Sequence, residues 1–258
     1  MDRATVPGPA PIASQSTPAD AETLKKIRNL LPHAAPYRYL EVGSYLGASL
    51  LPHLMDPACE TAISIDKRPT RQYDERNKFY SYEGVTTARM VGLLAAHAGP
   101  EAMSKLRTHD GTAGDLDLSA YAGTIDLAFI DGEHTTSAVF DDFLAVRRLM
   151  KPSSLIVFHD RLVVFQALMN VESLLRHSGQ PFERAFLPES VCVVAIGDVA
   201  ERARPWFAAE TFSRSTVEAA SREYLIRQTV KNYAIRCLRS ALGIRRRDAA
   251  HAGSSPVA

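Results

Sequence analysis

An apolar run that breaks into a glycine turn constrains the fold of this chain more than any other feature. Residues Tyr37 to Val42 are rich in aromatic and β-favouring types, which is typical of a buried strand. Gly43 and Gly47 interrupt the run, and apolar residues resume at helical spacing from Leu50 to Met55. A strand, a glycine turn and a helix start form the nucleoside- or phosphate-binding corner of doubly wound α/β sheets. The stretch therefore predicts an α/β fold with a ligand at this corner.

The spacing within the stretch indicates the ligand. Dinucleotide sites use G-x-G-x-x-G, whereas this chain has Glu41-x-Gly43-x-x-x-Gly47, with a carboxylate in place of the first glycine. A carboxylate there suits a cationic or amino-bearing ligand better than a pyrophosphate. The pattern resembles motif I of class I S-adenosylmethionine-dependent methyltransferases. That resemblance implies cofactor contacts from Glu41, Gly43, Ser44, Gly47 and Ser49. The alternative is a glycine turn that serves packing in another α/β protein.

Alternating strand and helix patterns continue along the chain. Further strands are predicted at 61–66, 105–109, 125–131 and 154–160, followed by a hairpin at 182–187 and 191–197. Helices are predicted at 21–31, 86–97, 137–150 and 163–177. The order agrees with the methyltransferase fold: a doubly wound, seven-stranded, mostly parallel, Rossmann-like sheet with helices on both faces. In that fold the last strand lies antiparallel beside the fifth.

Two strand ends carry further candidates for cofactor binding. Asp66 ends the second strand, where a carboxylate can accept hydrogen bonds from both ribose hydroxyls; the alternative role is a helix N-cap. Asp110 follows the third strand, and turns at that place lie near the adenine in the methyltransferase superfamily. Residues 67–84 between them are polar and aromatic. They form either a lid or substrate loop, or a surface segment with a short helix.

The ends of the fourth and fifth strands carry acids and histidines. Asp131 and His134 follow one strand, and His159 and Asp160 end the other. Because ligands bind at the carboxyl ends of strands in such sheets, we expect these side chains and the glycine turn to meet in one crevice. Asp131, His159 and Asp160 are candidate ligands of Mg²⁺, or of Mn²⁺ because of the histidine. Alternatively, Asp131 caps a helix and His159 is a hydrogen-bonded core histidine.

The runs Ile130 to His134 and Phe158 to Asp160 look like those of metal-dependent O-methyltransferases that act on sugar hydroxyls of macrolides and related metabolites (methyltransferase 24-like). The likeness implies Asp131 and Asp160 as metal ligands, Asp131 beside the cofactor, and His134 as general base. His159 departs from that group, which often has a second carboxylate there. The Asn/Asp-Pro-Pro-Tyr/Phe motif of methyltransferases that act on nucleic-acid bases is absent after the fourth strand.

The expected function is therefore S-adenosylmethionine-dependent methyl transfer to a hydroxyl of a small molecule or sugar, assisted by a divalent metal. The alternatives are a non-catalytic scaffold or membrane-associated protein that binds the cofactor, and a nicotinamide-dependent dehydrogenase. A formal net charge of +1 gives no reason to expect a nucleic-acid partner. Without a signal-like N-terminus or an apolar run of bilayer length, the expected location is cytoplasmic.

Composition divides the chain. Residues 1–18 are predicted to be a disordered tail, 19–200 the methyltransferase domain, 201–247 a helical extension that is basic at its end, and 248–258 a second disordered tail. A helix is expected at 213–244, with apolar residues on one face and arginines on the other. Such a helix can lie on an anionic membrane, or it can pack on the domain or on a second subunit of a homo-oligomer.

Overall fold

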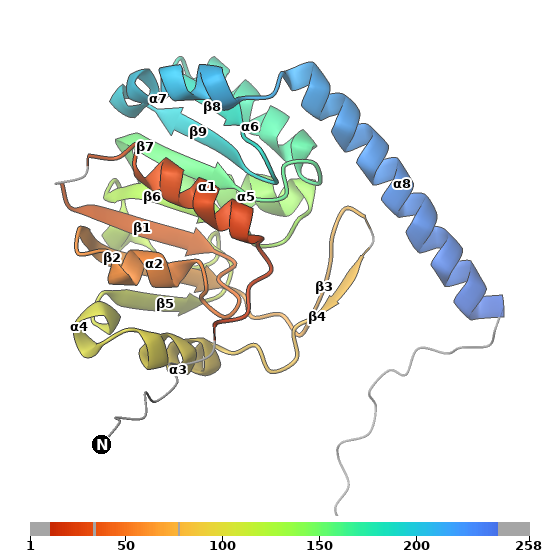
Figure 1. Ribbon diagram of the computed structural model, residues 1–258, viewed down its shortest axis with the longest axis horizontal. Helices are drawn as coiled ribbons and strands as arrows, with labels where there is room; N and C mark the ends of the chain where they lie inside the picture. The colour runs from red at the N-terminus through yellow and green to blue at the C-terminus, as the bar shows by residue number, and fades with distance from the viewer. Residues whose placement is uncertain (1–10, 33–34, 77, 242–258) are drawn as a thin grey trace, which may run out of the picture.

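The computed structural model describes residues 11–32, 35–76 and 78–241. Seven strands form the main sheet: β1 (Tyr37–Val42), β2 (Cys59–Asp66), β5 (Leu106–Asp110), β6 (Ile125–Ile130), β7 (Met150–Phe158), β8 (Phe182–Phe186) and β9 (Cys192–Ile196). Their order is β5-β2-β1-β6-β7-β9-β8, and the first five are parallel (Figure 1). Strand β9 is antiparallel to β7 and β8. The predicted seven-stranded, mostly parallel sheet is confirmed.

Helices cover both faces of this sheet. The helices are α1 (Pro18–Arg28), α2 (Leu50–Met55), α3 (Thr87–His97), α4 (Pro100–Met103), α5 (Thr136–Arg147), α6 (Phe165–His177), α7 (Asp198–Glu210) and α8 (Arg214–Ala241), with a 3₁₀ turn η1 (Ser119–Tyr121). Buried side chains of α1, α2, α3 and α7 share one core cluster, whereas those of α5 and α6 share the other. The sheet therefore lies between two layers of helices.

Strand β1 shows why the sequence folds this way. Five of its six residues are buried, because a central parallel strand is covered on both faces. Leu40 belongs to the core cluster that contains Phe143 of α5, and Tyr39 to the cluster that contains Leu50 of α2. Burial of one such large side chain is worth about 1.5 to 3 kcal/mol. Strand β1 pairs with β2 and β6, so its carboxyl end lies between theirs.

The segment 67–84 contains a small hairpin. Strands β3 (Arg71–Tyr73) and β4 (Phe79–Ser81) pair antiparallel, with Arg71 opposite Ser81. The short helix considered for this segment is wrong, because the described residues pair as strands instead. The hairpin lies between the main sheet and α8 (Figure 1).

Several expected boundaries differ from the structure. Helix α1 begins at Pro18, inside the stretch expected to be disordered, whereas residues 1–10 and 248–258 lie outside the described residues. The helix expected at 137–150 ends at Arg147, because residues from Met150 onward belong to β7. The domain boundary expected at residue 200 falls within α7. No helix in the described part of the chain is both long and apolar enough to cross a membrane.

Candidate active site

A cavity of about 650 Å³ opens at the carboxyl ends of the parallel strands. Residues that follow β1, β2, β5 and β6 line it, together with one side of α5. This is where ligands bind in open α/β sheets. Asp66 and Asp131 lie on its wall, as does Gly43 of the glycine turn. The structure thus brings three of the expected cofactor-binding residues to one cavity.

Gly43 allows the turn to approach the end of β6. Its φ is +88°, and a Cβ atom there would lie 2.2 Å from the carbonyl oxygen of Asp131. The amide of Gly43 donates to the carbonyl of Ile65 at 2.8 Å, and the amide of Asp131 donates to the carbonyl of Val42 at 2.9 Å. A side chain at position 43 would therefore push the glycine turn away from the neighbouring loop. Gly47, with φ +87°, packs in the same way against side chains of α3.

Glu41 lies beneath the turn rather than on the cavity wall. Its carboxylate is fully buried and accepts hydrogen bonds from Tyr39 Oη at 2.6 Å and Ser49 Oγ at 2.8 Å. Burial raises the pKa of Glu41 to about 7, against the opposing effect of these hydrogen bonds. Ser44 is also buried and accepts from Ser64 Oγ at 2.8 Å. In this arrangement Glu41, Ser44 and Ser49 hold the shape of the turn.

Asp66 organises the opposite wall of the cavity. Its carboxylate accepts the amide N–H of Tyr45 at 3.1 Å and that of Arg68 at 2.8 Å, and it pairs with the Arg68 guanidinium at 3.2 Å. The alternative role as a helix N-cap is wrong, because a loop and β3 follow Asp66. Asp110, by contrast, has a side chain that is 61% exposed and accepts from Thr87 Oγ1. The adjoining Gly111 and Thr112 line the cavity, so Asp110 lies beside it.

We expect Asp66→Asn to weaken binding of S-adenosylhomocysteine by about 10- to 100-fold, because hydrogen bonds to a charged group contribute about 1.5 to 3 kcal/mol. Calorimetric titration measures the affinity. Asp126→Asn is the matched control: its carboxylate also holds a backbone amide, that of Arg38, and a cation, Lys151, but it does not line the cavity. Equal affinity of the Asp66 variant and the wild type would exclude Asp66 as a cofactor ligand.

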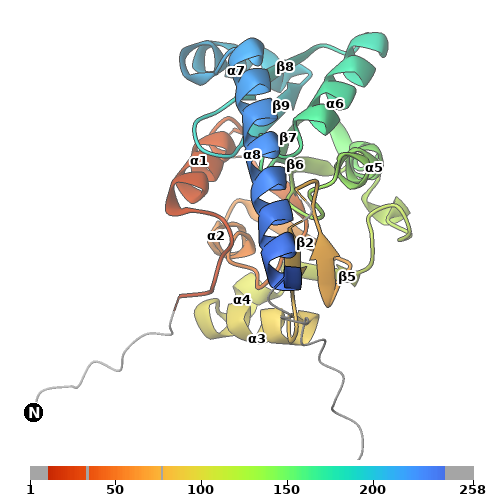
Figure 2. The ribbon, with the colours of Figure 1, turned by 90° about the vertical axis from the view of Figure 1, so that its right-hand side faces the viewer.

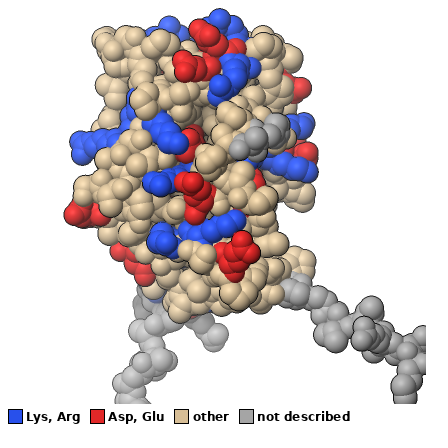
Figure 3. All heavy atoms as spheres, turned by 90° about the vertical axis from the view of Figure 1, so that its left-hand side faces the viewer, with Lys and Arg blue, Asp and Glu red and all other residues tan. Residues whose placement is uncertain are grey.

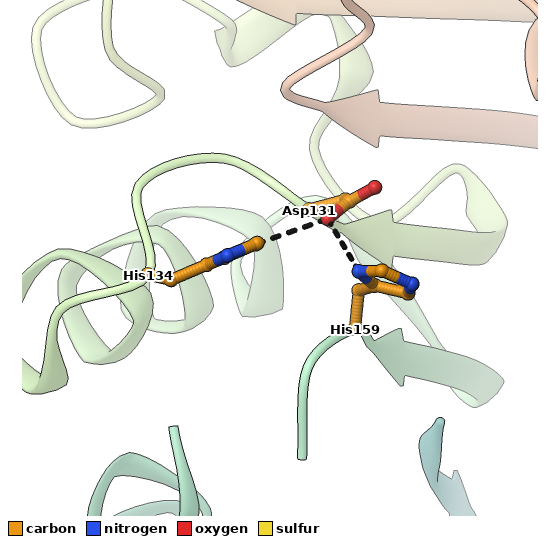
Figure 4. A group of neighbouring side chains, drawn as sticks. All are labelled: Asp131, His134 and His159. Carbon is orange, nitrogen blue, oxygen red and sulfur yellow. Dashed lines mark hydrogen bonds and ion pairs between the residues drawn. The ribbon is translucent and has the colours of Figure 1, made fainter. Parts of the chain in front are cut away.

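Asp131, His134 and His159 meet at the ends of β6 and β7 (Figure 4). Asp131 Oδ1 lies 3.0 Å from His134 Nε2 and 3.0 Å from His159 Nδ1. One candidate ligand atom from each residue lies within 4.8 Å of the other two. These three side chains are called the cluster below. Asp131 lines the cavity. Its half-buried carboxylate is the junction between the two histidines.

Asp160 joins the cluster through His134. Asp160 Oδ2 lies 2.9 Å from His134 Nδ1, so His134 contacts a carboxylate with each of its nitrogens. Asp160 also lies 3.6 Å from the Arg76 guanidinium of the hairpin, and its φ is +52°. Of the expected metal ligands, Asp131 and His159 are in direct contact, whereas Asp160 is connected to them through His134. In the group whose candidate ligand atoms all lie within 4.8 Å of one another, His134 takes the place of Asp160.

The carboxylates determine the protonation of the histidines. Burial lowers the pKa of His134, but the hydrogen bonds to Asp131 and Asp160 outweigh it and raise the pKa to about 9. Burial also lowers the pKa of His159, but the negative charge of Asp131 outweighs this effect and raises the pKa to about 11. Despite burial, the histidines hold the pKa of Asp131 below its ordinary value and that of Asp160 at about 2. At neutral pH the described groups thus form imidazolium–carboxylate pairs.

Asp20 of α1 holds the far side of His159, a role for which the sequence offered no signal. The carboxylate of Asp20 is buried and lies 3.5 Å from His159 Nε2, and Ser190 Oγ lies 2.9 Å from the same nitrogen. Ser190 also donates to Asp20 at 2.7 Å. On the cluster side, His159 Nδ1 is buried and lacks a hydrogen bond within the described structure, although Asp131 is near. The ring is therefore fixed with one nitrogen aimed at Asp131.

The segment 67–84, expected to form either a lid or substrate loop or a surface segment, contacts the site, whereas the contribution of α8 was missed. Arg76 is buried and contacts Asp74, the hydroxyl of Tyr80 and, on α8, the hydroxyl of Tyr224 at 2.8 Å. The amide of Glu75 donates to the carbonyl of His134 at 3.1 Å. The basic and aromatic composition of 67–84 was the only signal for this contact. The partners on α8 are about 150 residues away in sequence, where no local pattern connects them.

Comparison with known proteins identifies the domain. Residues 40–161 match a family model described as a methyltransferase domain. A calicheamicin methyltransferase shares the fold, with a TM-score of 0.54 and 15% identity over 70% of this chain and 79% of that one. Matches with lower scores include the O-methyltransferase NovP (TM-score 0.48, 12% identity, 68% and 78% covered) and a SAM-dependent methyltransferase from Aquifex aeolicus (0.44, 11%, 70% and 98%). A search of curated proteins found no match.

Residues 40–161 therefore form a methyltransferase domain, which makes the protein an S-adenosylmethionine-dependent methyltransferase. The matched segment runs from β1 through β7 and includes both the glycine turn and the cluster. The predicted resemblance is confirmed. The alternative of a nicotinamide-dependent dehydrogenase is wrong.

Proposed function

We propose that this methyltransferase transfers the methyl group to a hydroxyl of a sugar or another small molecule, with a divalent cation at the cluster and His134 as general base. The observation that carries the proposal is the meeting of His134 and His159 at Asp131, which lines the cavity, with Asp160 beyond His134. A hydroxyl is a poor nucleophile at neutral pH, so its methylation requires the removal of a proton. A carboxylate–histidine group that reaches the cavity at Asp131 suits that requirement.

The cluster has the chemistry of a metal site. Asp131 would supply an oxygen and His159 its Nδ1, the buried nitrogen without a hydrogen bond. Metal-binding histidines typically donate their other N–H to a carboxylate, as the contact between His159 Nε2 and Asp20 allows. Nitrogen ligands shift the preference from Mg²⁺ towards Mn²⁺. A divalent cation bound here would act as a Lewis acid that lowers the pKa of the acceptor hydroxyl.

The charges of the groups in direct contact agree with a cation. The carboxylates of Asp20, Asp74, Asp131 and Asp160 face three cationic groups, Arg76 and the imidazoliums of His134 and His159. Four negative charges against three positive ones leave a net charge of −1. Addition of a divalent cation and loss of one proton from His134 would make this group neutral, which favours His134 as the proton-accepting base.

Aromatic rings in the cavity support a sugar-like acceptor. Tyr45 and Tyr82 line it, with ring centroids 6.0 Å apart in a T-shaped arrangement, and Tyr80 stacks on Tyr82. Aromatic rings present an apolar face beside a polar hydroxyl, which matches the C–H face and hydroxyls of a sugar. The amides of Gln15 and Gln72 line the same cavity and offer hydrogen bonds.

The experiment combines turnover with metal binding. The purified chain is incubated with S-adenosylmethionine and a panel of glycosides and polyols, and formation of S-adenosylhomocysteine is measured with Mg²⁺, Mn²⁺ or EDTA. We expect transfer that EDTA abolishes and Mn²⁺ restores. In titrations without acceptor, Asp131→Asn should weaken Mn²⁺ binding by about 100-fold, since loss of a charged ligand leaves its partners uncompensated. Asp117→Asn, at an exposed aspartate outside the cavity, should not.

The possible results separate the parts of the proposal. Transfer that persists in EDTA, with unchanged Mn²⁺ binding by Asp131→Asn, would reject the metal. Transfer to amines or thiols but to no hydroxyl would reject the acceptor class. Cofactor binding without turnover on any acceptor would support the scaffold alternative instead.

A further inference from the structure

The outer face of α8 is an exposed apolar stripe, defined here as Ile226, Val230 and Tyr233. Their exposed fractions are 59%, 63% and 60%. They follow one another at intervals of four and three residues, so they lie on one side of the helix. Figure 2 shows α8 in front of the rest of the molecule, with no other element over it. Large apolar side chains exposed together on one helix face indicate a binding surface.

The inner face of α8 is attached to the domain. Val217 is buried in the core, and Ser221 Oγ donates to the carbonyl of Leu162 at 2.6 Å. Tyr224 Oη accepts from Arg76, and Asn232 Nδ2 donates to the carbonyl of Arg76 at 2.7 Å. Because these contacts occupy the opposite side of the helix, the stripe points away from the domain. Its exposure is therefore a consequence of how α8 is attached.

The charges of α8 become cationic towards its C-terminal end. Glu218 and Glu223 pair with Arg222 and Arg227 one turn further along α8. Beyond them, every charged residue from 228 to 247 is a lysine or an arginine, beginning with Lys231. On the opposite side of the molecule, by contrast, acidic and basic side chains are interspersed (Figure 3). Positive charge therefore accumulates along α8 towards its C-terminal end.

We propose that α8 binds the surface of an anionic lipid bilayer, with the stripe in the acyl boundary and the basic residues at the headgroups. Apolar residues on one face with lysine and arginine beside them are the combination that anchors interfacial helices. Pairing with α8 of a second copy would bring two cationic C-terminal halves together or place them against glutamates that are already paired. No described helix can span a bilayer, so the contact is peripheral.

Docking through α8 would place the membrane across that helix from the hairpin that contacts the candidate active site. Arg76, to which α8 is attached, lies 3.6 Å from Asp160. The hairpin that carries Arg76 lies on the same side of the sheet as α8 (Figure 1). The bilayer contact itself does not depend on the proposed methyl transfer, and its test requires no acceptor.

The test is co-sedimentation of the full chain with vesicles of phosphatidylcholine alone or with phosphatidylglycerol added. We expect binding to the anionic vesicles only, weakened at high salt because headgroup attraction is screened. The double variant Ile226→Ser/Val230→Ser should bind about tenfold or more weakly, since its stripe is no longer apolar. The matched control is Met55→Ser/Leu174→Ser, which removes two exposed apolar side chains outside α8 and should bind like the wild type. Circular dichroism verifies that both variants are folded.

Three results would overturn the proposal. They are absence of sedimentation with anionic vesicles, equal binding to vesicles of phosphatidylcholine alone, and unchanged binding by the stripe variant. Light scattering after size exclusion provides a fourth: a dimer in the wild type that the stripe variant loses would assign the stripe to a second copy.

Discussion

Among glycine-to-alanine substitutions at the site, Gly43→Ala is expected to lower the stability of the protein most. The new Cβ would lie 2.2 Å from the Asp131 carbonyl oxygen and 2.6 Å from Gly132 Cα, both of them backbone atoms that cannot rotate away. The φ of +88° is also unfavourable for alanine. We expect the free energy of unfolding to fall by at least about 3 kcal/mol, and Tm by about 6 to 12 °C. Affinity for S-adenosylhomocysteine should fall as well, because Gly43 lines the cavity.

Gly92→Ala is the matched control for this experiment. Gly92 lies inside α3, and a Cβ atom there would meet nothing within 4 Å. Alanine in a helix interior is more favourable than glycine by about 0.5 to 1 kcal/mol, so this variant should be slightly more stable than the wild type. Thermal unfolding followed by circular dichroism compares the two. A Gly43→Ala protein as stable as the wild type would show that the turn and the β6 loop are not held at the distance described here.

Loss of His134 is expected to have the largest effect on turnover. His134→Ala removes the imidazole between Asp131 and Asp160, and with it the proposed proton acceptor. General-base catalysis contributes about 10²- to 10⁴-fold, so methyl transfer should fall by that factor. Affinity for S-adenosylhomocysteine should change by less than about threefold, because His134 is absent from the residues that line the cavity. Rates and calorimetry on the same preparation measure both quantities.

The control for His134 is His177→Ala, which removes an exposed histidine at the end of α6 whose contact is a backbone carbonyl of its own helix. Its turnover should equal that of the wild type. Full activity in His134→Ala would remove His134 as the base. A parallel loss of cofactor affinity would instead assign His134 a role in supporting the cavity.

Local sequence patterns predicted the fold because they are repeated along the chain. The apolar run at 37–42 and the glycines at 43 and 47 determine a strand and a turn through short-range sterics and burial alone. The alternation of strand and helix then leaves few topologies, since parallel strands require crossovers of one hand. The rule that strand ends meet at one edge also brought Asp131, His134, His159 and Asp160 together in the prediction, and the structure has them in contact.

The sequence alone also determined the cavity wall at Gly43 and Asp66, since Gly43 follows β1 and Asp66 ends β2, and these strands lie next to each other in the sheet. Only the tertiary structure decided which groups set the protonation state and the orientation of the side chains in the cluster. Asp20 reaches His159 from α1, and Arg76 connects the hairpin and α8 to Asp160. These partners are separated from the cluster by many residues, and their contacts depend on where helices and loops pack. The periodicity of apolar residues predicts which face of a helix or strand a residue occupies. The pKa of a side chain, and its ability to bind a metal, depend instead on its distances to side chains of other elements.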